Sequence, residues 1–121
     1  MSFYLTLEDN TIKKLENLQV GDRILCEDGL YHPVLNVFVV SSYPLFCRLS
    51  NGLTYYVPER MMLKTIHGFK KPALWDILEL GKDLTPQIVA VRNIEKVMFF
   101  HDILIDGNMI TPEGVVFKYA S

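Results

Sequence analysis

Short apolar stretches, separated by turn-forming residues, run along the whole chain. Phe3, Leu5 and Leu7 alternate with more polar positions, and this period of two predicts a half-exposed strand. The β-branched run from Val34 to Val40 predicts a central strand. Further strands are predicted at residues 23–27, 88–91, 97–105 and 114–119. The pattern predicts a compact all-β fold of many short strands, in a single domain over residues 1–121.

Glycine, asparagine and aspartate mark the turns between these strands. Asp28-Gly29 follows one strand as a hairpin signal, and Asn51-Gly52 joins two strand-like runs. Both central residues of a type I′ turn need positive φ, which Asn and Gly tolerate. A tight type I′ hairpin is therefore predicted at Asn51-Gly52. The runs 60–66 and 69–72 are less regular, with Gly68 between them.

Two segments carry leucine and isoleucine at helical spacing. Ile12, Leu15 and Leu18 recur every three residues, which predicts a short strand followed by a helical turn. Leu74, Ile77 and Leu78 are spaced as on a helix face. One or two helical turns are expected over 74–80, stopped by the glycine that follows.

A short repeat connects these two segments. Leu18-Gln19-Val20-Gly21-Asp22-Arg23-Ile24 returns as Leu78-Glu79-Leu80-Gly81-Lys82-Asp83-Leu84. Each copy has two apolar residues before a glycine and a third apolar residue three places after it. The repeat predicts a duplicated unit with internal pseudo-symmetry, in which Gly21 and Gly81 serve the backbone conformation rather than phosphate binding.

Composition and charge exclude several classes of function. The chain has 121 residues, a net charge of −2 and scattered Lys and Arg residues, so no basic stripe could follow a nucleic acid backbone. No apolar run approaches the ~20 residues that span a bilayer, and the N-terminus resembles no signal peptide. We expect a soluble, cytoplasmic protein with no nucleic acid or membrane partner.

The cysteine and histidine positions give no strong indication of a metal site or a catalytic site. Cys26 and Cys47 stand in apolar contexts without CxxC spacing, which predicts buried free thiols. The three histidines, His32, His67 and His101, lack metal-ligand spacing, so no metal or cofactor is predicted. A zinc site or a Cys-His hydrolase built from these residues stays open as an alternative. His101-Asp102 could form an oriented base, but neighbouring strand residues point to opposite faces.

Taken in order, the segments resemble the Hint module of inteins and hedgehog autoprocessing domains over nearly the whole length. The resemblance rests on these segments: Leu7-Glu8-Asp9-Asn10, Leu15 to Asp22, the Asn51-Gly52 hairpin leading into Val57-Pro58-Glu59-Arg60, Leu78 to Leu84, His101 to Ile105, Asp106 to Met109, and Gly114 to Tyr119. It implies a pseudo-two-fold-symmetric, horseshoe-shaped β fold.

The departures from the family fall on its chemistry. The resemblance implies a Cys or Ser nucleophile at a position that precedes Met1, and Ser2, the nearest hydroxyl, is misplaced. In the family's Thr-x-x-His motif the chain has Val57 and Arg60. Valine cannot form a hydrogen bond through its side chain, and arginine stays protonated.

The end of the chain departs in the same way. The family's terminal His-Asn is replaced by Lys118-Tyr119, and a tyrosine cannot cyclise to a succinimide. The histidine of a Gly-Asn-His turn is replaced by Met109. The expectation is therefore a Hint-like domain that has lost protein splicing and autoprocessing, and is retained as a structural or protein-binding module.

Other functions remain possible from the sequence. One is residual or split-type self-cleavage that uses a nucleophile from outside this chain, and another is a small β-barrel binding module unrelated to Hint. Modules of this family occur in microbial and phage genomes, so the resemblance implies a phage or mobile-element protein, in the host cytoplasm or the virion.

Two adjacent aromatic pairs are candidates for a protein-binding surface. Because neighbouring strand residues face opposite sides, one ring of Tyr55 or Tyr56, and one of Phe99 or Phe100, should point away from the core. Exposed aromatic residues dominate protein interfaces. A protein partner is therefore expected to contact these rings.

Overall fold

Residues 3–80 and 85–120 are described by the computed structural model, and they form thirteen strands and one short 3-10 helix. The elements are β1 (Tyr4–Thr6), β2 (Ile12–Lys14), η1 (Leu15–Asn17), β3 (Arg23–Leu25), β4 (Tyr31–Pro33), β5 (Asn36–Ser42), β6 (Leu45–Leu49), β7 (Thr54–Val57), β8 (Met61–Thr65), β9 (Gly68–Lys70), β10 (Ile88–Asn93), β11 (Met98–Leu104), β12 (Met109–Ile110) and β13 (Val116–Tyr119). The predicted all-β fold is confirmed.

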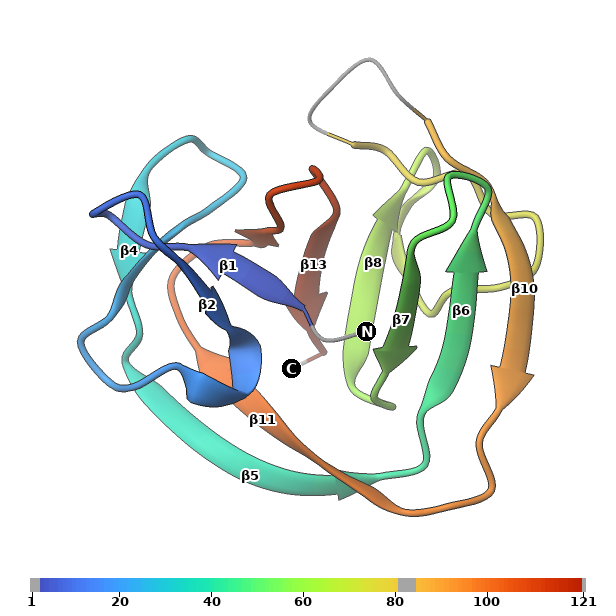
Figure 1. Cartoon of the computed structure of the whole chain (residues 1–121), viewed down its shortest axis with the longest axis horizontal. Coiled ribbons are helices and arrows are strands. Elements are labelled where there is room, and N and C mark those ends of the chain that lie inside the picture. Colours follow the sequence, from blue (N-terminus) through green and yellow to red (C-terminus); the bar gives the residue numbers. More distant parts are fainter. Residues whose placement is uncertain (1–2, 81–84, 121) are drawn as a thin grey trace.

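The strands form small antiparallel sheets arranged along a curve. The two larger sheets have the orders β10-β6-β7 and β12-β13-β8-β9, whereas β1-β2, β3-β4 and β11-β5 pair in twos. Figure 1 shows β5 and β11 running along one side and joining the group of β1 to β4 to the group of β6, β7, β8 and β10. The chain thus bends into an open arc whose concave side receives β1 and β13.

The core joins residues from the beginning, middle and end of the described chain. The Phe3 ring stacks on Tyr55 with centroids 4.6 Å apart and lies 4.7 Å from the Phe117 ring. Leu5 and Leu63 are fully buried with Phe117 in the same cluster. Burial of such large side chains stabilises the fold by about 1.5–3 kcal/mol each. The packing therefore fixes β1, β7 and β13 against one another.

The predicted hairpin at Asn51-Gly52 forms between β6 and β7, but the predicted type I′ turn is wrong. Gly52 has φ +90°, whereas Asn51 is not among the residues with positive φ. The Leu49 amide donates to the Leu53 carbonyl at 2.8 Å, which closes a loop of three residues. Three-residue hairpins need one left-handed residue rather than two, and Gly52 supplies it.

The helical turns predicted over 74–80 are wrong. Trp75 takes φ +73°, and its amide donates to the Ile88 carbonyl at 2.8 Å. Ile77 and Leu78 form isolated bridges with Gln87 and Thr65. Neighbouring strands thus offer backbone partners to an extended segment, and these outweigh a weak helical spacing. The helical turn predicted after β2 does form, as η1.

The β-branched run near Val34 is not a central strand. It forms β5, which pairs only with β11 among the described residues, and much of it faces solvent. In contrast, the stretch 60–72, whose sequence pattern is less regular, contains the regular strands β8 and β9. On β8, Met61, Leu63 and Thr65 are buried in strict alternation.

The repeated segments place equivalent leucines in the core. Leu18 is 4% exposed and Leu78 is fully buried. Gly21 has φ +93°, a conformation that glycine adopts readily. The second glycine, Gly81, and the residues up to Leu84 lie outside the described residues, as does Ser2.

Candidate functional site

Strand pairing brings the end of the chain beside the turn that precedes β8. In β13, Lys118 pairs with Met62 and Tyr119 with Met61. The Ala120 amide donates to the Arg60 carbonyl at 2.6 Å, and the Arg60 guanidinium donates through Nη2 to the Ala120 carbonyl at 2.8 Å. Arg60 is therefore held against the last described residue from both its backbone and its side chain.

A cavity of about 340 Å³ lies at this junction. Arg60, Lys118 and Tyr119 line it, together with Asp102 of β11. Val57 is 1% exposed and packs in the hydrophobic core instead. Three of the four positions singled out from the sequence thus gather at one cavity, and Val57 does not reach it.

Asp102, which the sequence suggested only as an orienting partner of His101, bonds Arg60 at this cavity instead. Its Oδ2 accepts a hydrogen bond from Arg60 Nη1 at 3.0 Å, and its side chain is only 7% exposed. Its buried Oδ1 has no hydrogen-bond partner among the described residues. Burial raises the pKa of the Asp102 carboxyl, and the Arg60 charge opposes this rise. The feature of the sequence that pointed to Asp102 was a carboxylate within the mostly apolar strand Met98–Leu104.

Tyr119 and Lys118 are committed to other contacts. The Tyr119 hydroxyl donates to the His101 carbonyl at 2.8 Å, and burial raises the pKa of this phenol. Lys118 Nζ lies over the Phe69 ring, 4.6 Å from its centroid, in a cation-π contact. The Tyr119 phenol is therefore not a proton donor or acceptor suited to neutral pH.

His101 does not form a pair with Asp102. Their register partners on β5 are Val39 and Phe38, so the two side chains leave opposite faces of the ribbon, as expected. The His101 Nδ1 atom is buried and has no hydrogen-bond partner within residues 3–80 and 85–120. The hypothetical oriented base is thus not assembled.

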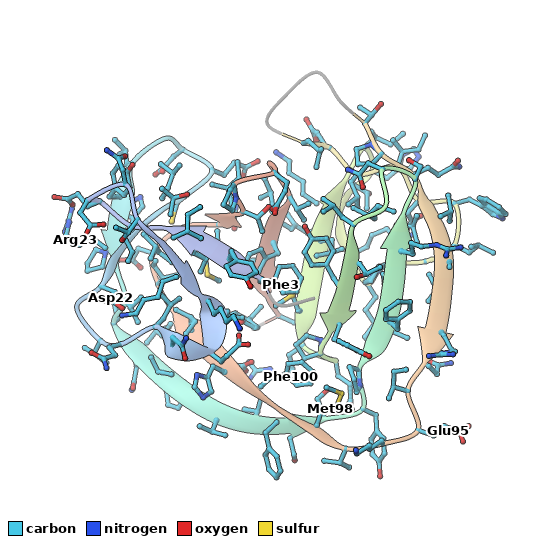
Figure 2. All side chains as sticks on the ribbon, viewed as in Figure 1. Phe3, Asp22, Arg23, Glu95, Met98 and Phe100 are labelled. Atoms are coloured by element: carbon cyan, nitrogen blue, oxygen red, sulfur yellow. The ribbon has the colours of Figure 1, made fainter. Side chains whose placement is uncertain are left out.

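A second, more apolar cavity of about 300 Å³ lies nearer the start of the chain. The residues that line it include Phe3, Tyr56, Met98, Phe100 and His101. Figure 2 shows Phe3, Met98 and Phe100 directed to the concave side of the arc. Tyr119 lines the first cavity and His101 lines the second.

The cysteines are buried free thiols, as predicted. Burial raises the pKa of both Cys26 and Cys47 to about 11, so few of these thiols are ionised at neutral pH. His32 Nε2 lies 2.7 Å from Asp28 Oδ2. No three His, Cys, Asp or Glu side chains of the described chain gather where they could hold a metal ion.

The aromatic pairs differ in exposure. Tyr55 is 3% exposed and belongs to the core, whereas Tyr56 is partly buried. Phe99 is 76% exposed and Phe100 is partly buried. Trp75 is also exposed. Across the described residues, no helix has the length and apolar character needed to cross a membrane.

Known structures share this architecture although their sequences are distant. No protein-family model and no curated protein sequence matches the chain. The Ssp DnaB mini-intein variant M86 is 16% identical with a TM-score of 0.80, over 99% of this chain and 93% of that one. A DnaB intein from Synechocystis sp. PCC 6803 is 18% identical with a TM-score of 0.78, over 99% and 95%.

The gp41-1 intein is similar to the same extent. It is 18% identical with a TM-score of 0.76, over 98% of this chain and 94% of that chain. At this level of identity the likeness concerns the backbone, and the reactive residues are a separate question. The chain has the all-β Hint fold of inteins.

Proposed function

We propose that the chain is a Hint-fold domain without autoprocessing activity that serves as a structural or protein-binding module. The observation that carries the proposal is the position of Arg60. Its guanidinium bonds Asp102 Oδ2 and the Ala120 carbonyl, at the place where the resemblance implies a histidine.

Arginine suits a clamp better than a proton shuttle. Its guanidinium stays protonated at physiological pH and offers five donors in a fixed plane. A general base must take up a proton near the working pH, which Arg60 cannot do. Its two contacts instead fix the end of β13 against β11.

The other replaced positions support the same proposal. Val57 occupies the core and offers no donor or acceptor to a scissile bond. Tyr119 has no side-chain amide, so it cannot attack its own carbonyl to release the following residue. Its hydroxyl is used in the hydrogen bond to His101. Each position contributes packing or a structural hydrogen bond.

The test is a fusion of one reporter domain ahead of Met1 and a different one behind Ser121. Intact-mass measurement over a day at neutral pH should show one unchanged polypeptide. A matched variant carries Val57→Thr, Arg60→His, Lys118→His and Tyr119→Asn, which restores the family's residues at these four positions. We expect this variant to release a measurable fraction of the downstream reporter.

Time-dependent cleavage of the unmodified fusion would contradict the proposal and favour residual self-cleavage. If cleavage occurs at the upstream junction, a Ser2→Ala variant shows whether Ser2 is the nucleophile. Cleavage that persists in that variant would assign the reaction to another group.

A further inference from the structure

The β5·β11 ribbon, comprising Asn36–Ser42 and Met98–Leu104, is a two-stranded sheet with several exposed apolar side chains. Among the described residues, β5 and β11 pair only with each other, so each leaves one edge without a strand partner. All seven residues of β5 are uncharged, and none is proline or glycine. The ribbon therefore presents a regular, unblocked strand edge.

Apolar side chains surround this edge. Phe38 is 49% exposed and Val39 is 66% exposed on β5, and Phe99 is 76% exposed on β11. Val39 and Phe99 share one face, because Phe99 lies opposite Ser41 in the register. Leu35, Tyr43, Val97 and Leu104 extend the exposed apolar surface at the two ends of the ribbon.

The ribbon's ionisable side chains do not protect the edge. The Asp102 carboxylate is turned inward to Arg60, and His101 is half-buried. Other short strands carry lysine, namely Lys13 and Lys14 on β2 and Lys70 on β9. Lysine, proline and bulges are the usual means of preventing strand-to-strand association, and β5 has none of them.

We propose that β5 pairs with β5 of a second copy of this chain, in antiparallel orientation about a two-fold axis at Val39. A two-fold axis generates antiparallel pairing of identical strands and a self-complementary surface. With Val39 opposite its own copy, all seven residues of β5 find partners and Phe38 lies opposite Val40. No like charges meet. The result is a four-stranded sheet of order β11-β5-β5-β11.

The alternative edge is less suitable for the same symmetry. Pairing β11 with β11 about its middle residue places His101 opposite its own copy, where protonation brings two like charges together. The uncharged composition of β5 also argues for a second copy over a charged partner protein, since it offers no ion pair to such a partner.

The register matches residue types across the axis. Asn36 lies opposite Ser42, which pairs two polar residues, and Phe38 lies opposite Val40, which pairs two apolar residues. Phe38 is 49% exposed on β5 itself and is covered in part by the second copy, whereas Phe99 lies on β11, one strand away from the joint. A strand edge that complements itself in this way favours a second copy of this chain as the occupant.

Sedimentation velocity at protein concentrations from about 1 to 200 µM tests the proposal. The chain has a mass of 13.9 kDa, and the wild type should shift to twice that mass as concentration rises. Val39→Lys places two like charges at the axis and should weaken dimerisation by at least about tenfold. Ile66→Lys is the matched control, because Ile66 is 49% exposed and lies in the turn between β8 and β9, outside the ribbon.

Cross-linking tests the register independently. Directly opposite strand residues have Cα atoms about 4.5–5.5 Å apart, which suits a disulfide. Val39→Cys should therefore cross-link two copies on mild oxidation, whereas Ser41→Cys should not, because residue 41 lies opposite residue 37 of the other copy. The native cysteines are buried and serve as an internal control.

If the wild type stays monomeric over the whole concentration range, the proposal is overturned, and the ribbon would then be a surface for a different protein. An equal effect of the two lysine variants, or equal cross-linking of the two cysteine variants, overturns it as well. A circular dichroism spectrum and melting curve for Val39→Lys separate loss of assembly from loss of folding. The proposal is independent of autoprocessing, since polypeptide mass reports cleavage and sedimentation reports assembly.

Discussion

The sheet β12-β13-β8-β9 and the β5·β11 ribbon use polar and apolar residues in opposite ways. In the sheet, the Lys64 side chain binds the Glu27 carboxylate and lies 3.8 Å from Glu79. On the ribbon, Phe38 and Phe99 face outward. The sheet thus combines a buried apolar face with paired charges, whereas the ribbon exposes apolar side chains without any exposed carboxylate or amine on its strands.

This contrast shows which part of the molecule stabilises the fold and which part is available for association with another chain. Charges in the sheet connect segments that are distant in sequence, such as Lys64 and Glu27, which are separated by 37 positions. The ribbon needs few such connections because its two strands are paired over all seven residues. Its outer surface is therefore free to serve association.

The largest difference should come from removing one phenylalanine from each region. Phe117 is fully buried, and Phe117→Ala should lower the free energy of unfolding by about 3–5 kcal/mol. Phe99→Ala should change it by less than about 0.5 kcal/mol, measured below the concentration of assembly. Urea unfolding followed by tryptophan fluorescence measures both. Similar losses in the two variants would remove the distinction between the regions.

Arg60→Ala should have the next largest effect. It leaves the buried Asp102 carboxylate without its partner and frees Ala120, at a cost of about 1–2 kcal/mol after allowance for the exposure of the guanidinium. Asp102→Asn in the same chain should recover part of the loss, because no buried charge is then left unpaired. A double-mutant cycle measures this coupling, and additive effects would show that the pair does not interact.

Glu27→Gln tests how the ion pair between Glu27 and Lys64 contributes to stability as the pH changes. Burial acts to raise the pKa of Glu27, but hydrogen bonds from Lys64 and Asn108 outweigh it, so the pKa lies below the ordinary 4.5. A lowered folded-state pKa contributes stability above the unfolded-state pKa, and this is lost as the pH falls. The variant should therefore be about 0.5–1 kcal/mol less stable at pH 7, with a smaller difference at low pH. Glu95→Gln, at an exposed position, should show no such trend.

The smallest change in stability is expected for a substitution on the ribbon, although it should clearly reduce the exposed apolar area. Phe38→Ser should alter the free energy of unfolding of the monomer by less than about 0.5 kcal/mol, since half of the ring already faces solvent. Binding of a hydrophobic dye should nevertheless fall, because exposed apolar area is removed. Unchanged dye binding would show that the ribbon is not the main apolar surface.

Local patterns in the sequence were sufficient for the β class and for most strand positions. Asp28-Gly29 and Asn51-Gly52 each mark a real hairpin, because turn chemistry acts within a few residues. The turn type at Asn51-Gly52 was not predictable from the two residues alone. It depends on where pairing between the flanking strands ends, here at Leu49 and Leu53.

Features that depend on distant partners were not predictable. The β-branched residues of β5 indicate a strand, but the number of neighbouring strands depends on the path of the whole chain. Extended structure near Trp75 forms because Ile88 offers its backbone groups. The contact between Arg60 and Asp102 likewise joins two segments whose local sequences give no sign of each other.

The pairing of β5 with β11 also governs how the chain reaches its native state. Met98 pairs with Ser42 and Leu104 with Asn36, so the ribbon joins the second quarter of the chain to the last. Closing so large a loop is entropically costly, and folds dominated by such contacts form slowly. Until the last strands are made, β5 has two open edges and no charge to keep other chains away. Refolding yield should therefore fall with protein concentration, with β5 as the segment that starts the aggregates.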